Sequence, residues 1–92
     1  MHEMGIAASV LDAMAKELHR YPGCRALKIG IRIGEFAGVD GDSVRFCFDV
    51  IAKDAGYAPL DLVIESAPND ELDFAWLELD DVKIEEPEVV PV

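Results

Sequence analysis

The sequence predicts an α+β domain in which two helices pack on one face of a three-stranded mixed sheet, in the order helix, strand, helix, strand, strand. Two segments repeat apolar residues at helical spacing, and a third alternates apolar residues with small or basic ones, as a half-buried strand does. The chain has 92 residues, of which 51% are hydrophobic, and this suits one small core. Covering one face of the sheet with both helices buries all these apolar patterns together.

The first helix is expected from about Glu3 to His19, because apolar residues recur at every fourth position. Tyr21, Pro22 and Gly23 then end it. The apolar stripe is Ile6, Val10, Met14 and Leu18, and the residues expected outside it are Asp12, Lys16, Glu17 and Arg20.

Residues 27–33 give the clearest strand pattern. Glycine weakens a strand, so Gly30 and Gly34 indicate that another part of the chain approaches closely there. The apolar positions are Leu27, Ile29, Ile31 and Ile33, and they alternate with Lys28, Gly30, Arg32 and Gly34.

A loop from Glu35 to Gly41 leads to a second helix from about Ser43 to Asp54, which Asp40 or Asp42 can cap. A short second strand is expected from Leu60 to Ile64.

A polar turn at Ser66–Asp70 precedes the closing strand, Leu72–Leu79. The apolar alternation of this strand slips by one residue after Trp76, and such a slip predicts a β-bulge. The folded domain is expected to cover residues 1–84, and Glu85–Val92 a flexible tail, since this segment contains two prolines.

The net charge is −11, which argues against nucleic acid and against an anionic membrane surface as partners. It suits a cationic partner, either a metal ion or a basic protein surface, although solubility alone also accounts for it. No apolar run approaches the ~20 residues of a membrane span, and the first residues do not resemble a signal peptide. We therefore expect a cytoplasmic protein.

Cys24 and Cys47 are too far apart in the sequence for a CxxC motif and are expected to be thiols. Cys47 falls in an apolar helical pattern and is expected in the core, whereas Cys24, in a loop, is expected to be the more reactive. No nucleophile–base pattern or phosphate-binding glycine loop is present, so the chain is not expected to be an enzyme.

The first three residues, Met1, His2 and Glu3, can chelate a metal. The terminal amine, the His2 amide and the His2 imidazole close a five- and a six-membered ring, and the Glu3 amide can add a fourth nitrogen. A tetragonal set of nitrogen donors favours Cu(II) or Ni(II) over Zn(II). A free α-amine titrates near ~7.7–8.0 and a free imidazole near ~6.5, so affinity should rise between about pH 6 and 8.

Simpler interpretations of the same residues remain open. An exposed histidine at position 2 usually has no metal role, and Glu3 in a first helical turn complements the helix dipole. His19 suits a helix C-terminus for the same reason. Asp40 is a candidate oxygen ligand, but a helix cap is the commoner role of an aspartate at such a position.

Several segments together resemble the hydrogenase maturation nickel metallochaperones, the HypA/HybF family, over about residues 1 to 80. The opening tripeptide combined with the Ile33-Gly34-Glu35 turn is the most specific part. The segments that carry the resemblance are Met1–Ala7 with Ser9–Leu11, Lys28–Val39, Val44–Asp49, Leu60–Glu65 and Glu71–Leu79.

The resemblance implies delivery of nickel(II) to the large subunit of a [NiFe]-hydrogenase, usually with a partner GTPase. It places nickel on the amine of Met1, the imidazole of His2 and the adjoining amides, including that of Glu3. The Glu3 side chain is then expected either to orient the nickel ligands or to contact a partner, and Glu35 is expected to contact a partner.

The family normally carries a zinc domain with two CxxC pairs between the last two strands, where this sequence has only the turn at Ser66–Asp70. No cysteine follows Cys47, so we predict no zinc site and a plain hairpin of the last two strands. The alternative function is a docking or scaffold paralog of the same fold, without metal, that recognises a maturing enzyme subunit. A homodimer through an exposed strand edge is a further possibility.

Overall fold

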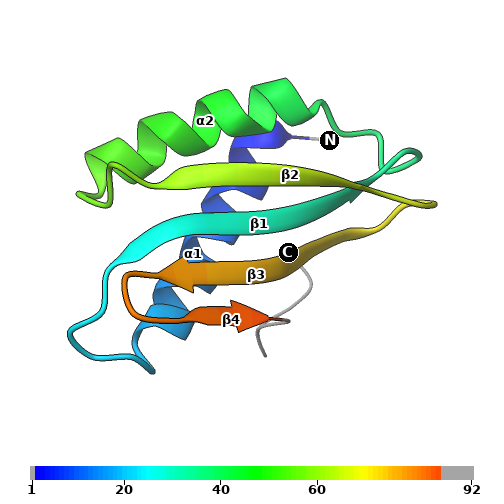
Figure 1. Ribbon diagram of the computed structural model, residues 1–92. Helices are drawn as coiled ribbons and strands as arrows, with labels where there is room; N and C mark the ends of the chain where they lie inside the picture. Colours follow the sequence, from blue (N-terminus) through cyan, green and yellow to red (C-terminus); the bar gives the residue numbers. More distant parts are fainter. Residues whose placement is uncertain (1, 86–92) are drawn as a thin grey trace.

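The computed structural model describes residues 2–85, which form two helices and a four-stranded sheet (Figure 1). The predicted α+β class is confirmed, with one strand more than expected. In chain order the elements are α1 (Glu3–Leu18), β1 (Ala26–Gly34), α2 (Gly41–Asp54), β2 (Asp61–Ala67), β3 (Leu72–Leu79) and β4 (Lys83–Glu85).

The fourth strand, β4, pairs antiparallel with β3 after a tight turn closed by the Leu79 N–H and the Val82 carbonyl, 2.8 Å apart. Three residues are too few to show an alternating pattern, so nothing in the sequence signalled this strand. Glu85, which we had assigned to the tail, is its last residue. The rest of the expected tail lies outside the described residues.

The strand order β2-β1-β3-β4 overturns the predicted hairpin of the last two strands, because β1 lies between β2 and β3. The connection through α2 makes β2 a parallel neighbour of β1, as crossover connections do, and leaves the other edge of β1 for antiparallel β3. The segment between β2 and β3 therefore passes across the end of β1. It is held there by hydrogen bonds from the Gly34 N–H to the Glu71 carbonyl (2.6 Å) and from the Phe36 N–H to the Asn69 carbonyl (2.7 Å).

The predicted bulge is present in β3. Gly30 pairs with Trp76 while Ile31 pairs with Phe74, so Ala75 is the extra residue. The bulge turns the Trp76 side chain away from the core face of the sheet, on which Phe74 lies.

Trp76 instead lies on the sheet face away from the helices, where it spans several strands. Its ring covers Gly30 of β1, and its Nε1 donates a hydrogen bond of 2.8 Å to Glu65 Oε2 of β2. Lys83 Nζ of β4 lies 4.6 Å from the ring centroid. Beside it, Arg32 and Asp73 form an ion pair of 3.2 Å.

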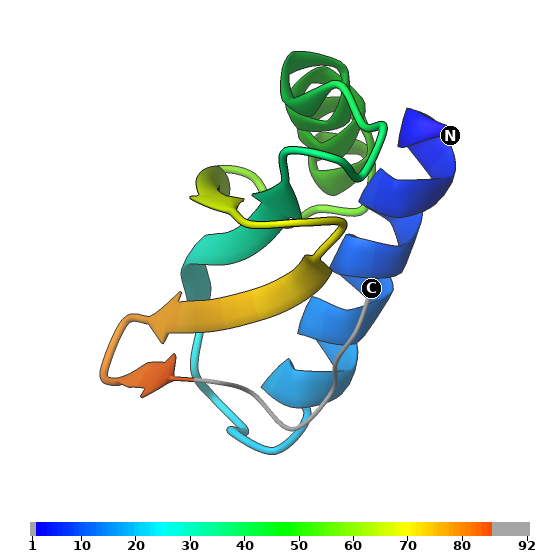
Figure 2. The same ribbon diagram turned by 90° about the vertical axis from the view of Figure 1, so that its right-hand side faces the viewer.

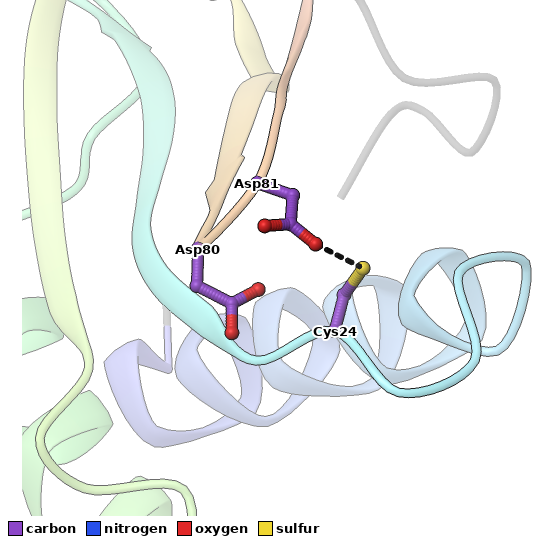
Figure 3. A group of neighbouring side chains, drawn as sticks. All are labelled: Cys24, Asp80 and Asp81. Carbon is purple, nitrogen blue, oxygen red and sulfur yellow. Dashed lines mark hydrogen bonds between the residues drawn. The ribbon is translucent and has the colours of Figure 1, made fainter.

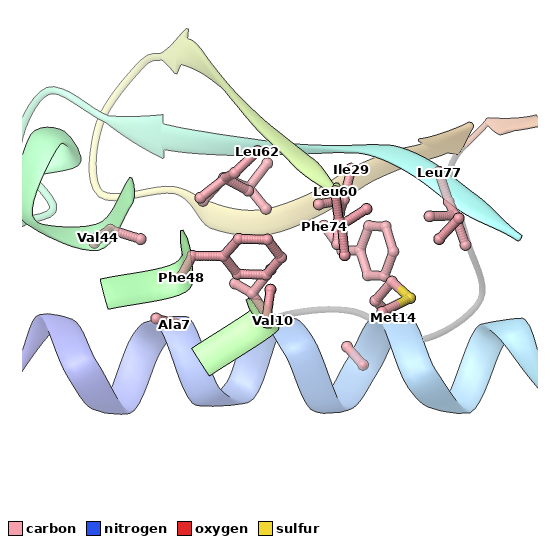
Figure 4. Packing of buried hydrophobic residues seen from close by; sticks show 14 of the residues in the cluster. Ala7, Val10, Met14, Ile29, Val44, Phe48, Leu60, Leu62, Phe74 and Leu77 are labelled. Carbon is pink, nitrogen blue, oxygen red and sulfur yellow. The ribbon is translucent and has the colours of Figure 1, made fainter. Parts of the chain in front are cut away.

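Both helices pack against the other face (Figures 1 and 2). Figure 4 shows Phe48 of α2 and Phe74 of β3 pointing into the layer between sheet and helices. Glu17 of α1, which we expected in solvent, is buried at 1% exposure; Arg20 lies 3.7 Å from its Oε2. None of the helices in the described part of the chain is long and apolar enough to cross a membrane.

Candidate metal site

The candidate metal-binding tripeptide lies at the start of α1. His2 is the residue before the helix; its backbone is extended, its side chain is exposed, and it makes no capping hydrogen bond. The first helical hydrogen bond joins the Ile6 N–H to the His2 carbonyl, 3.1 Å apart. The amides of His2 and Glu3 thus precede the hydrogen-bonded part of the helix, where N–H groups have no intrahelical acceptor. Met1, whose amine would complete the chelate, lies outside the described residues.

Glu3 joins the start of α1 to the start of α2. Its Oε2 accepts a hydrogen bond of 3.3 Å from the backbone N–H of Asp40. Glu3 also lies in the first turn of α1, where we expected its carboxylate to complement the helix dipole. The contact brings the first residues of both helices to one place, 37 positions apart in the sequence.

Asp40 is the N-cap of α2, as one of the two interpretations predicted. Its Oδ1 accepts from the Asp42 N–H at 3.1 Å, and its Oδ2 accepts from the Ser43 hydroxyl at 3.0 Å. Because both oxygens already have donors, Asp40 would have to share one of them in order to ligate a metal.

The end of the molecule around His2 is acidic. Three segments at this end of the molecule, residues 2–5, 35–43 and 68–71, contain no lysine or arginine, and hydrogen bonds link the second of them to the other two. Glu35 is exposed in the turn after β1, and its backbone N–H donates to the Ala67 carbonyl at 3.1 Å. Such a surface attracts a cation. Its carboxylates are Glu3, Glu35, Asp40, Asp42, Asp70 and Glu71.

The remaining candidates from the sequence lie elsewhere. His19 is exposed at the C-terminal end of α1, a full helix length from His2. Cys47 is partly buried and packs against the core, as expected.

A second group of potential ligands, which the sequence analysis missed, lies at the opposite end of the sheet (Figure 3). The ligand atoms of Cys24, Asp80 and Asp81 all lie within 4.8 Å of one another. Asp81 Oδ2 is 4.0 Å from the thiol sulfur, whereas Asp80 Oδ1 accepts from the Arg25 N–H at 3.1 Å. Antiparallel pairing of Ala26 with Leu79 brings the three together, and that pairing could not be read from the sequence.

The environment of Cys24 raises the pKa of its thiol. The larger cause is desolvation of the thiol, and the smaller is the repulsion of a thiolate by the carboxylates of Asp81 and Asp80. A raised pKa means less thiolate at neutral pH, and the thiolate is the reactive form. The expectation that Cys24 is the more reactive of the two cysteines stays a prediction, and the raised pKa of its thiol weighs against it.

Together these observations describe a small α+β domain with an exposed histidine and several carboxylates where its two helices begin. A family model described as hydrogenase/urease nickel incorporation, metallochaperone, hypA, matches residues 1–71. The chain belongs to this HypA family, as the resemblance in its sequence predicted.

Among its relatives are proteins named hydrogenase maturation factor HypA. That of Desulfatibacillum aliphaticivorans is 36% identical over 69 residues, which are 74% of this chain and 53% of the relative. That of Pelodictyon phaeoclathratiforme is 38% identical over 65 residues, which are 71% of this chain and 56% of the relative. That of Chlorobaculum parvum is 39% identical over 66 residues, which are 71% of this chain and 58% of the relative. The chain thus spans little more than half the length of these relatives. No solved structure matches it.

Proposed function

We propose that this chain is a nickel carrier in hydrogenase maturation, which binds Ni(II) through the amine of Met1, the imidazole of His2 and the amides of His2 and Glu3. The observation that carries the proposal is the family match, which includes this tripeptide. The geometry at His2 supports it, because the imidazole is exposed and the two amides precede the helical hydrogen bonds.

The proposed site suits a carrier, which must also release its metal. An exposed chelate at the first residues can be reached by an acceptor site without unfolding the domain. Loading requires the loss of protons from the amine, the imidazole and the ligating amides, so nickel affinity rises with pH. The acidic surroundings of His2 favour a divalent cation, while a tetragonal set of nitrogen donors selects Ni(II) or Cu(II).

We further propose that the acceptor is the large subunit of a [NiFe]-hydrogenase and that a nickel-handling GTPase assists. Two relatives named as hydrogenase maturation factors support the first part. Glu3 and Glu35, on the acidic end, are the proposed partner contacts. Two cysteines cannot form a four-cysteine zinc site, so the proposed role uses nickel without zinc bound by these 92 residues.

The two histidines provide a matched test, since both are exposed and they flank the same helix. Calorimetric titration with Ni(II) at pH 8 should show one site per chain. His2→Ala should weaken it at least about a hundredfold, beyond the loss typical of an outer-shell partner, and His19→Ala should leave it unchanged. Equal binding by both variants would contradict the proposal. Absence of any nickel binding would leave a metal-free docking module.

A further inference from the structure

Helix α2 is apolar on two sides, and only one of them faces the core. Val44, Phe48 and Ala52 are buried against the sheet and α1. Phe46 and Val50 have the same four-residue spacing, but each follows a buried residue by two positions. Because successive residues are ~100° apart around a helix, Phe46 and Val50 lie about 200° from the buried face. They are 70% and 48% exposed. The stripe formed by Phe46 and Val50, the outer stripe, therefore contributes nothing to the core of the described domain.

An open hollow of about 530 Å³ adjoins the outer stripe. It is lined by Val50 and Ile51 together with Lys53 and Asp54. A space of this size accommodates large side chains of another molecule. Stripe and hollow share Val50, so they form one continuous surface along α2.

The surface is bordered mainly by carboxylates. Asp42 precedes Phe46 by one helical turn, Asp49 follows it by three residues, and Asp54 follows Val50 by four, so all three are helical neighbours of the stripe. The bordering cations are Lys53 and Arg45, and the Arg45 guanidinium donates to the Leu62 carbonyl on the edge of β2. With a chain charge of −11, a second copy would be repelled.

We propose that the outer stripe docks a basic amphipathic helix of another protein, with apolar residues at i and i+4 and lysine or arginine beside them. Two helices that pack through such stripes interlock their apolar side chains, and the flanking charges select a basic partner. The inference rests on α2 alone and does not require nickel.

The probe is a synthetic helical peptide with leucines at i and i+4 and flanking lysines, titrated into the isotope-labelled chain and followed by amide chemical shifts. Saturable shifts along α2 are expected. Replacing the lysines by glutamates, or the leucines by serines, should each weaken binding at least about tenfold.

The chain offers a closely matched control. Phe36 and Met4 are 73% and 48% exposed, like Phe46 and Val50, but lie off the outer stripe. Phe46→Ser with Val50→Ser should weaken binding at least about tenfold, and Phe36→Ser with Met4→Ser should not. Should the first pair unfold the chain, Asp49→Lys with Asp54→Lys tests the same surface and should weaken binding equally.

Three results would overturn the proposal: equal loss in the control pair, undiminished binding of the serine peptide, or sedimentation showing a homodimer that Phe46→Ser with Val50→Ser abolishes. The first would place the peptide elsewhere. The second would reduce binding to charge attraction. The third would make a second copy the occupant.

Discussion

The ring of Trp76 occupies the space that a side chain at Gly30 would need. A Cβ atom placed on Gly30 would lie 2.2 Å from Trp76 Cε2, far inside contact distance. The absence of a side chain at this point of β1 lets the indole cross the strand and reach Glu65 on β2. One glycine thus permits a contact between strands that are not neighbours in the sheet.

Gly30→Ala should displace the indole and destabilise the fold by about 1–3 kcal/mol, the range for overpacking a closely packed site. Because Trp76 is the only tryptophan, its fluorescence should shift in the folded state as well. Urea unfolding followed by this emission measures both. Gly5→Ala is the control: its Cβ meets only His2 Cβ at 3.9 Å, and alanine in a helix should stabilise by about 0.5–1 kcal/mol. Unchanged emission and stability in Gly30→Ala would contradict the packing.

Gly34→Ala should be more damaging than Gly30→Ala, at about 3 kcal/mol or more. Its Cβ would lie 2.4 Å from the Asn69 carbonyl oxygen and 2.6 Å from the Glu71 nitrogen, and backbone atoms cannot rotate away. Thermal unfolding is the measurement. Gly38→Ala is the control that has backbone strain without crowding, because Gly38 has φ of +70° and no atom within 4 Å of its Cβ position. This substitution should destabilise the fold by about 1–2 kcal/mol. A smaller loss in Gly34→Ala than in Gly38→Ala would refute this account of the β2–β3 connection.

Asp40 can be tested as a cap and as a metal ligand with two substitutions. Asp40→Ala removes the hydrogen bonds to Asp42 and Ser43 and should cost about 1 kcal/mol, whereas Asp40→Ser retains a capping oxygen and should cost little. Both should keep nickel affinity, because the proposed ligands are nitrogen atoms of Met1, His2 and Glu3 and do not include the Asp40 carboxylate. Stability comes from urea unfolding and affinity from calorimetry. A stable Asp40→Ser protein that binds nickel weakly would instead make Asp40 a ligand.

Cys24 should react slowly with iodoacetamide near pH 8, because its raised pKa keeps the thiolate fraction small. The rate should climb as the pH passes the raised pKa. Asp81→Asn removes a carboxylate that contributes to the shift, so its rate profile should move to lower pH. Mass spectrometry of the Cys24 peptide gives the rate, and Asp70→Asn, at the other end of the sheet, is the control. Identical profiles for Asp81→Asn and the parent chain would disprove the electrostatic part of the explanation.

Local patterns predicted the helices and the main strands because those patterns are set by neighbours along the chain. The spacing of Ile6, Val10 and Met14 reflects one helix face, and the alternation from Leu27 to Ile33 one strand face. The glycines of β1 correctly indicated close approach. The hairpin predicted for the last two strands was wrong, since the pairing of β1 with both β2 and β3 joins residues far apart in sequence.

The candidate sites also combine features set by neighbours along the chain with contacts between residues far apart in sequence. The capping role of Asp40 is local and could be predicted, but the hydrogen bond from Asp40 to Glu3 could not. Nickel binding at His2 stays a prediction. The group of Cys24, Asp80 and Asp81 forms only when the sheet pairs. The burial of Glu17 was missed because a charged residue was assumed to face solvent.

The most direct test of nickel binding at the N-terminus is to block the amine of Met1. The native-start chain and an N-acetylated chain of the same sequence should be titrated with Ni(II) at pH 6 and pH 8, with visible absorption recorded. We predict one planar nickel site in the free-amine chain that is stronger at pH 8, as loss of amine and imidazole protons requires, and none in the acetylated chain. Equal nickel binding by both chains would contradict the proposed site.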